Sequence, residues 1–217
     1  MLYYNECCND WGAAFDSTKN LSDAIMNFDY YAPETEYYYG KINCWDVSAI
    51  EDMSYLFAHS FINEPIDCWN VTSVTNMDGM FQNAESFNQP LDNWDVSKVA
   101  TMGVMFDGAT SFDQPLVSWN VGRVTDMSYM FSDATSFNQP LDSWNVDRVT
   151  TMQGMFYGAN SFNQALCTWY KISCLNAPDF TDMFYTSSSC PSTAVPDCNT
   201  MTSFCGTCTK VTYRLDC

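Results

Sequence analysis

Tryptophan recurs along this chain at a nearly constant spacing, and this regularity restricts the fold more than any other feature. Successive intervals are 24, 25, 25, 25 and 25 residues, between Trp45, Trp69, Trp94, Trp119, Trp144 and Trp169. The sequence between the tryptophans is also repeated, as in "SFNQPLDNWDVSKVATMGVMF" (86–106) and "SFNQPLDSWNVDRVTTMQGMF" (136–156). A fixed period of about 20 to 50 residues indicates stacked units, each of which buries its apolar face against its neighbours.

Apolar residues stand at fixed offsets from each tryptophan from Trp45 to Trp144, as Val96, Val99, Met102 and Phe106 do after Trp94. Stacking such units aligns identical side chains in columns. A unit of this length fits one short strand of about three to five residues and a compact return. The apolar spacing in "MSYMFSDA" (127–134) indicates a helical turn within that return.

We therefore predict a single right-handed, β-rich solenoid with short parallel strands and disulfide-bonded caps. Five repeats of about 25 residues occupy residues 41–169, since the tryptophan period covers them. Residues 1–40 are expected to form an N-terminal cap, and residues 170–217 a cysteine-rich C-terminal cap.

The cysteines lie toward the two ends of the chain, and none occurs between Trp69 and Leu166. The disulfide candidates are Cys7, Cys8, Cys44, Cys68, Cys167, Cys174, Cys190, Cys198, Cys205, Cys208 and Cys217. Because end units have one bare face, covalent bonds there are expected to replace the missing neighbour. The cytosol would keep 11 thiols reduced, so the chain is expected in an oxidising, extracellular compartment.

Two pairings remain open at the N-terminal side. Cys44 and Cys68 each precede a tryptophan, so adjacent coils would bring them within disulfide reach, at about 4.8 Å. The alternative is that each is bonded to Cys7 or Cys8.

The C-terminal side holds seven cysteines, so one is left over unless the two ends of the chain exchange a bridge. The leftover cysteine is either unpaired and buried or bonded to another copy of the chain. Two other interpretations concern the same region. They are a zinc site formed by Cys190, Cys198, Cys205 and Cys208, and a redox motif in "CGTC" (205–208).

The charge of the chain excludes several partners. It carries 8 Lys+Arg against 26 Asp+Glu, a net charge of -18. Nucleic acid and anionic membrane surfaces are therefore not expected as partners, since both require a cationic face. No apolar run reaches about 18 residues, so no membrane span is predicted. The charge permits cationic partners and calcium, although we predict no cofactor.

The unit resembles the repeats of BspA-like surface proteins, which are relatives of leucine-rich repeats that are rich in methionine and phenylalanine. "NWDVSKVATM", "NVTSVTNMDGMF" and "SFNQPLDSWNVDRVTTMQGMF" carry this resemblance, over residues 41–169. It implies a leucine-rich-repeat-like coil and an extracellular or cell-surface protein that acts in adhesion and protein–protein contact. The family has no shared catalytic residues to transfer to this chain.

The chain contains no motif that supports catalysis, and we do not expect an enzyme. His59 is the only histidine and stands where one repeat is a residue short, so a polar surface role is expected. No G-x-S-x-G or H-E-x-x-H motif occurs. An Asp or Asn follows each tryptophan from Trp45 to Trp144, such as Asp46 or Asn70. It is expected to bond the backbone of its own turn, with calcium or ligand binding as the alternative.

Three groups of surface residues are candidate sites. "YYAPETEYYYG" (30–40) contains Tyr37, Tyr38 and Tyr39, either as a flap over the first coil or as a contact surface for assembly. Asn20 and Asn70 begin N-x-S/T sequons and are candidates for glycosylation. The binding-face candidates on the exposed ladder of the repeats are Thr75, Asn76, Thr101, Thr125, Asp126, Thr150 and Thr151.

The expected function is that of a non-catalytic extracellular structural or adhesive protein that assembles with itself into a fibre or surface layer. The alternative is a monomeric recognition module at the cell surface that binds a protein or glycan along the ladder. A third hypothesis is an ice- or mineral-binding surface built on the threonine columns.

Overall fold

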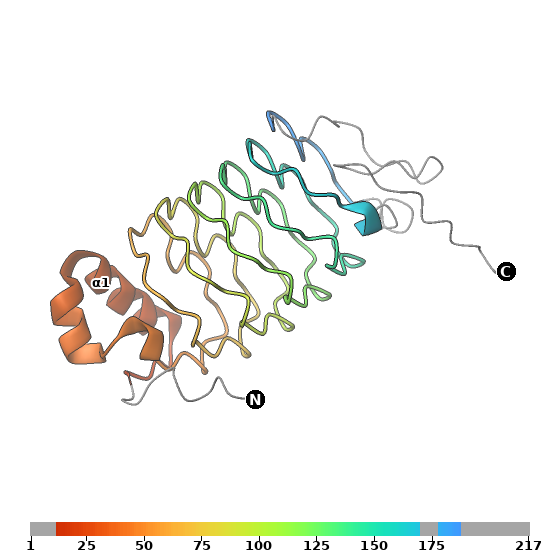
Figure 1. Ribbon diagram of the computed structural model, residues 1–217. Coiled ribbons are helices and arrows are strands. Elements are labelled where there is room, and N and C mark those ends of the chain that lie inside the picture. The colour runs from red at the N-terminus through yellow and green to blue at the C-terminus, as the bar shows by residue number, and fades with distance from the viewer. Residues whose placement is uncertain (1–11, 170–177, 188–217) are drawn as a thin grey trace.

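The computed structural model describes residues 12–169 and 178–187 as a helix at one end of a stack of coils (Figure 1). Its helices are α1 (Thr18–Tyr39), η1 (Ile42–Cys44) and η2 (Cys167–Trp169). Residues 178–187 add a further turn to the stack, because Thr151 bridges to Asp179 and the Phe156 ring stacks on Phe184 at 5.4 Å. The described stack therefore extends past residue 169, where the predicted repeats end.

The core consists of the columns that the repeat period predicts. The phenylalanine column is stacked nearly parallel, with ring centroids 5.3 Å apart between Phe81 and Phe106 and 5.6 Å apart between Phe106 and Phe131. A second phenylalanine column stands beside it, since the Phe112 ring lies 4.1 Å from Phe106. All of these rings are buried in one continuous cluster. Each coil therefore supplies the apolar neighbour that the next coil requires.

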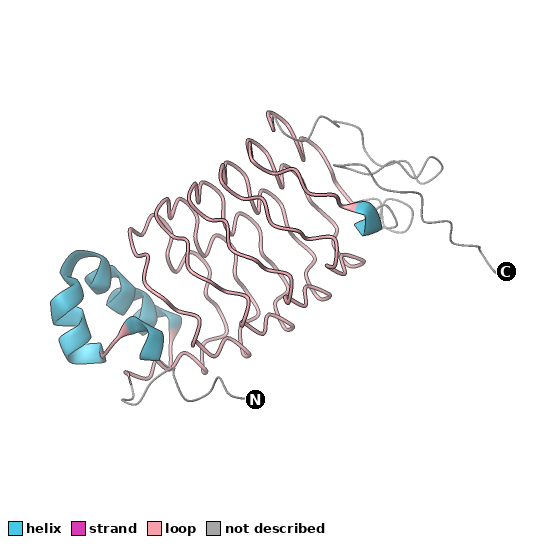
Figure 2. Ribbon diagram, viewed as in Figure 1, coloured by secondary structure: helices cyan, strands magenta, loops and turns pink. Residues whose placement is uncertain are grey.

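The predicted fold class, a right-handed β-rich solenoid of leucine-rich-repeat-like coils with short parallel strands, is wrong. The described residues contain helices, turns and loops but no strand (Figure 2). The coils pair only through isolated parallel bridges, such as Asn76 with Thr101 and Asp126 with Thr151. The stack is therefore built from turns, and single residues link its successive coils.

The hydrogen bonds explain why strands do not form. In residues 77–84, alternate amides donate to the next coil, as from Gly79 to the Gly103 carbonyl at 2.8 Å. The intervening amides donate within their own turn, as from Gln82 to the Gly79 carbonyl at 2.9 Å. A strand needs a run of extended residues, and this alternation of turns leaves none.

Two positions in each described coil have positive φ. The helical turn predicted over 127–134 is therefore wrong. Tyr129 has φ 53° and Asp133 has φ 51°, and both values belong to the left-handed region, which a right-handed helix cannot contain. His59, with φ 60°, is exposed and occupies the same position as Asp133 in an earlier coil. This histidine is therefore a turn residue at the surface.

Val104 occupies the left-handed position of its coil with φ 49°, although a β-branched residue is disfavoured there. We expect Val104→Gly to raise the free energy of unfolding by about 1 kcal/mol, because relief of strain exceeds the entropic cost of glycine. Urea unfolding measures the change. Val117→Gly is the matched control, since Val117 is exposed and has no positive φ, and it should lose stability. Equal losses in both variants would contradict the account.

Helix α1 covers the first coil with a stripe of apolar residues at helical spacing. Leu21, Ala24, Ile25 and Phe28 are buried, and the Phe28 ring meets Trp45 edge to face at 6.1 Å. The Ser17 side chain caps the helix by accepting a hydrogen bond from the Asn20 amide at 3.4 Å. The apolar stripe thus closes the exposed end of the stack.

The second half of α1 runs in a different direction. Pro33 has no amide hydrogen and its ring conflicts with the carbonyl four residues earlier, and Tyr31 has non-helical angles of φ -141° and ψ 49°. The helix ends at Gly40, whose amide donates to the Glu36 carbonyl at 2.9 Å. The kink turns residues 32–39 away from the axis of the first half. No helix in the described ranges is long and apolar enough to cross a membrane.

Candidate functional site

The binding-face candidates lie on the ladder that joins the coils. Asn76, Thr101, Asp126 and Thr151 occupy successive bridge positions and are half-buried. The Thr101 hydroxyl donates to the carboxylate of Asp78. These residues therefore hold neighbouring coils together as well as lining the surface.

The exposed threonines beside them also use their hydroxyls between coils. Thr75 donates to the Glu51 carbonyl at 3.2 Å, Thr125 to the Ala100 carbonyl at 3.2 Å and Thr150 to the Thr125 carbonyl at 2.9 Å. Their hydroxyl hydrogens already have acceptors. The threonine columns thus contribute methyl groups and hydroxyl oxygens to the surface.

The Asp or Asn that follows each tryptophan from Trp45 to Trp144 accepts a hydrogen bond from the amide two residues further on. The distance is 3.0 Å from Ser48 to Asp46 and 3.2 Å from Gly122 to Asn120. This is the turn geometry that the sequence predicts for the column. Residues 12–169 and 178–187 contain no group of three or more His, Cys, Asp or Glu side chains that could hold a metal ion.

Three carboxyls with shifted pKa values accept hydrogen bonds in turns of this kind, of which Asp46 and Asp95 follow tryptophans and Asp179 occupies a bridge position of the ladder. The side-chain hydroxyl of Ser48, followed by its amide, holds the pKa of Asp46 below its usual value. Ser97 has the same effect on the pKa of Asp95, and Thr181 on that of Asp179. Hydrogen bonds to the charged form cause all three shifts. The shifts therefore mark turns rather than a pair of catalytic acids.

A shallow groove of about 860 Å³ on the side of the stack gathers the positive charge of the repeats. We call it the basic groove, and its lining includes Thr75, Lys98, Asn120, Arg123, Asn145 and Arg148. All three cations are exposed, and within the described chain the only ion pair joins Lys19 and Asp23. The groove thus presents exposed positive charge, without a close ion pair, on a strongly acidic protein.

The basic groove was missed in the sequence because net charge concealed it, although a signal was present. Lys98, Arg123 and Arg148 each stand four residues after a tryptophan, in three consecutive coils. Ala49 and Ser73 occupy the same position in the two earlier coils. Aligning the repeats column by column would have separated this row of cations from the acidic surroundings.

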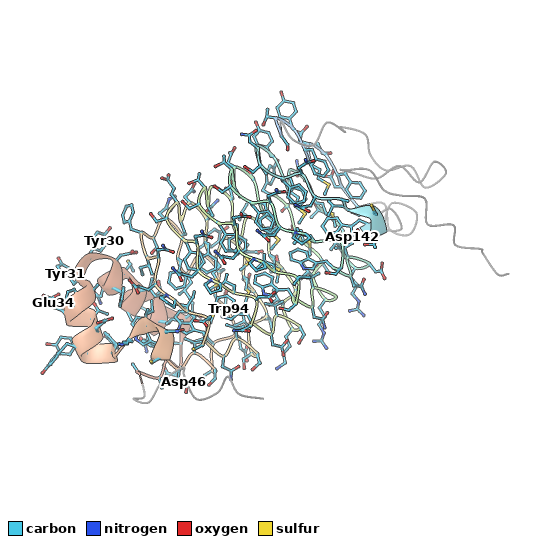
Figure 3. All side chains as sticks on the ribbon, viewed as in Figure 1. Tyr30, Tyr31, Glu34, Asp46, Trp94 and Asp142 are labelled. Atoms are coloured by element: carbon cyan, nitrogen blue, oxygen red, sulfur yellow. The ribbon has the colours of Figure 1, made fainter. Side chains whose placement is uncertain are left out.

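The predicted tyrosine segment places two of its three residues in solvent. Tyr37 is 83% exposed and Tyr38 76%, and their rings meet edge to face at 5.2 Å. Tyr30 and Tyr31, at the kink of α1, are 73% and 63% exposed. These four residues form what we call the tyrosine surface, and Figure 3 shows Tyr30 and Tyr31 on the outer side of the helix.

Tyr39 differs from the other two, because it packs inward. Its ring lies 5.9 Å from Phe15 and 6.0 Å from Trp45. The flap interpretation therefore fits Tyr39, while the contact interpretation fits Tyr37 and Tyr38.

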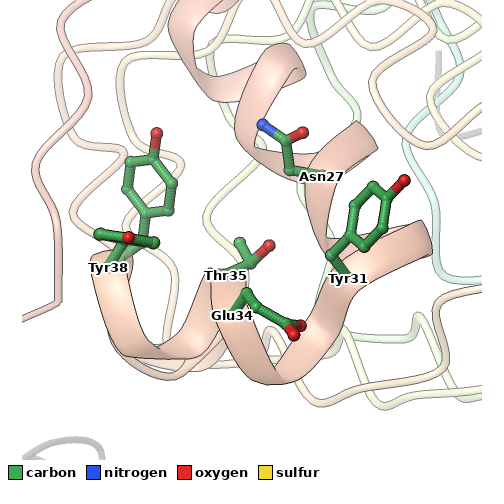
Figure 4. A pocket seen from close by; sticks show the side chains of 6 residues that line it. Asn27, Tyr31, Glu34, Thr35 and Tyr38 are labelled. Atoms are coloured by element: carbon green, nitrogen blue, oxygen red, sulfur yellow. The ribbon is translucent and has the colours of Figure 1, made fainter.

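A pocket of about 580 Å³ lies beside the tyrosine surface, lined by Asn27, Tyr31, Glu34, Thr35, Tyr38 and Tyr39. Figure 4 shows Glu34 and Thr35 between Tyr31 and Tyr38. Among the described residues, Glu34 and Glu36 form no ion pair, whereas Asp29 accepts hydrogen bonds from Ser60 and Phe61 at 2.9 and 3.0 Å. Glu34 and Glu36 therefore leave free carboxylates next to the exposed rings.

Both sequon asparagines are exposed. The side-chain amide of Asn20 donates to Asp16 at 3.3 Å, and the side-chain oxygen of Asn70 accepts from the Thr72 hydroxyl at 2.7 Å. Their glycosylation stays a prediction.

Cys44, Cys68 and Cys167 take part in disulfides. Which cysteine each is bonded to stays a prediction. The remaining candidates, including the residues of the proposed zinc and redox sites, lie outside the described residues: Cys7, Cys8, Cys174, Cys190, Cys198, Cys205, Cys208 and Cys217.

Comparison with known protein families gives a match that covers much of the chain. The family described as "Mycoplasma protein of unknown function, DUF285" matches the chain twice, over residues 26–121 and 91–195. No curated protein and no solved structure matches the chain significantly. The two family matches overlap within the repeats and together span most of the 217 residues. The chain therefore belongs to the DUF285 family.

Proposed function

We propose that this chain is a non-catalytic, extracellular structural or adhesive protein whose copies assemble with one another through the tyrosine surface. The observation that carries the proposal is the exposure of Tyr30, Tyr31, Tyr37 and Tyr38 on one helix. Tyrosine is enriched at protein interfaces, because its ring offers a large apolar face and its hydroxyl a polar contact. The cost of leaving four such rings in water favours their burial in an assembly.

Two further observations support the location and the type of function. Disulfides at Cys44, Cys68 and Cys167 suit an oxidising compartment outside the cytosol. The resemblance of the repeats to BspA-like surface proteins favours adhesion and contact between proteins. The alternative function, a monomeric recognition module, predicts a chain that stays single at every concentration.

The double variant Tyr37→Ser Tyr38→Ser tests the proposal. We expect the wild-type chain to associate as its concentration rises, and the variant to lose at least about tenfold in association constant, since central interface tyrosines are frequent hot spots. Sedimentation velocity over a concentration series measures both. The thermal midpoint of the variant should stay close to that of the wild type, because exposed side chains contribute little to folding.

Tyr185→Ser is the matched control. Tyr185 is a tyrosine that is 54% exposed, lies outside α1 and belongs to the last turn at the opposite end of the stack. It should leave association unchanged. A wild-type chain that remains monomeric throughout the series would overturn self-assembly and favour the recognition module, and an equal loss in the control would remove the tyrosine surface from the proposal.

A further inference from the structure

The tyrosine surface and the basic groove are complementary in charge and in chemistry. The tyrosine surface carries the free carboxylates of Glu34 and Glu36 beside exposed rings. The basic groove carries Arg123 and Arg148, whose guanidinium groups bind carboxylates through two parallel hydrogen bonds and stack on aromatic faces. Each surface supplies the groups that the other lacks.

The charge distribution makes the groove selective for such a partner. Of the five Lys and Arg residues in the described ranges, three line the groove, while the whole chain has a net charge of -18. At the column that carries Asp46 and Asp95 in other coils, the groove holds the neutral Asn120 and Asn145. An approaching carboxylate therefore meets little repulsion at this position and strong repulsion over most of the remaining surface.

Two acids border the groove and restrict the part that can bind. The Asp95 carboxylate interacts with the charge of Lys98, and Asp147 is the chain neighbour of Arg148. Arg123 is flanked by Gly122 and has no acidic neighbour in the groove lining. We therefore place the centre of the contact at Arg123, with Arg148 beside it.

The spacing of the cations along the basic groove also matches the spacing of Glu34 and Tyr38 along α1. The coils of Arg123 and Arg148 are closely stacked, since the ring centroids of Trp119 and Trp144, four residues before the two arginines, are 6.3 Å apart. Glu34 and Tyr38 are separated by one helical turn, a rise of about 6 Å. A carboxylate can thus reach one guanidinium while the ring one turn further along covers the next, where a cation–π contact adds to the attraction.

We infer that the basic groove is the docking site for the second half of α1, residues 32–39, of another copy of this chain. This inference rests on the proposed self-assembly and names its second surface. Because the two contacting surfaces differ, the interface is heterologous, and each bound pair leaves one groove and one helix free to bind further copies. Such an interface extends into an open chain of copies instead of a closed dimer.

Charge reversal on each side tests the inference. We expect Glu34→Lys Glu36→Lys and Arg123→Glu Arg148→Glu each to weaken self-association at least about tenfold, measured by sedimentation velocity. The first variant changes the net charge from -18 to -14 (-18 + 4), so general repulsion falls and cannot explain a loss. Glu64→Lys Glu85→Lys is the matched control, because it makes the same charge change at exposed acids outside α1 and should not weaken association.

The most informative result is whether self-association recovers when the two charge reversals are combined. The chain with all four substitutions keeps the wild-type net charge of -18, and so does an equimolar mixture of the two double variants on average. We expect association to return in both samples, because the introduced ammonium groups of the helix then face the introduced carboxylates of the groove. Circular dichroism should show that all variants remain folded.

The outcomes separate this inference from the proposed function. If the wild type associates and the tyrosine variant does not, while the charge reversals have no effect or are not rescued, copies assemble through the tyrosine surface against another site and the inference fails. If the wild type is monomeric, both fail. If only the groove variant loses association and recovery is absent, the groove binds a surface other than α1, which also overturns the inference.

Discussion

Replacing Phe106 by alanine should lower the free energy of unfolding by about 3 to 5 kcal/mol, one of the two largest effects expected in this chain. Phe106 is completely buried in the middle of the stack and contacts the rings of Phe81, Phe112 and Phe131. Removing its ring leaves a cavity bounded by the coils on both sides. Because each coil is stabilised by its neighbours, the loss weakens two interfaces at once.

Urea unfolding followed by circular dichroism measures this loss. Phe61→Ala is the control, since it removes the same ring from a position 74% exposed and should change stability by less than about 0.5 kcal/mol. Similar stability of the two variants would show that the stacked phenylalanines do not form the core.

Loss of a disulfide at the N-terminal end should have the second large effect. We expect Cys44→Ser and Cys68→Ser each to lower the free energy of unfolding by about 2 to 4 kcal/mol, because a cross-link reduces the entropy of the unfolded chain. If the two cysteines are bonded to each other, the double variant should lose no more than either single variant. If they belong to separate disulfides, the losses should add.

Denaturation of the three variants without reductant makes this comparison, and a peptide map of the unreduced protein identifies the bonded pairs. Wild-type stability in all three variants would contradict a structural role for these disulfides. Treatment of the wild type with reductant should reproduce the loss seen in the double variant, or exceed it where Cys167 also contributes.

The columns of the core could be predicted from the sequence because burial requires apolar residues at every repeat. A period of 25 residues aligns Phe81, Phe106 and Phe131, and their rings stack in that order. The backbone between the columns could not be predicted in this way. Spacing reports which side chains face inward, whereas strands and turns differ in φ and ψ.

The left-handed residues illustrate this limit. Gly154 is a conventional left-handed residue, but Val104 and Tyr129 occupy the equivalent position in earlier coils. Neither residue type signals positive φ, so nothing at this position of those two repeats indicated the turns that replace the expected strand. Only alignment with the repeats that carry Gly79 and Gly154 there would have indicated it.

The candidate surfaces were predicted in part. The density of tyrosines marks Tyr37 and Tyr38 in the sequence. Only the structure shows that Tyr39 differs from them, because it packs against Phe15 and Trp45. The basic groove depends on the stacking of coils, which brings together residues 25 positions apart. A total charge of -18 describes the molecule as a whole and conceals such a local concentration of cations.

Negative-stain electron microscopy of the native, unreduced protein is the decisive test of whether copies of this chain assemble. We expect short rods joined into open chains in which the end of one rod meets the side of the next. In the Arg123→Glu Arg148→Glu variant these chains should separate into single rods. Isolated rods at every concentration of the wild type would rule out assembly.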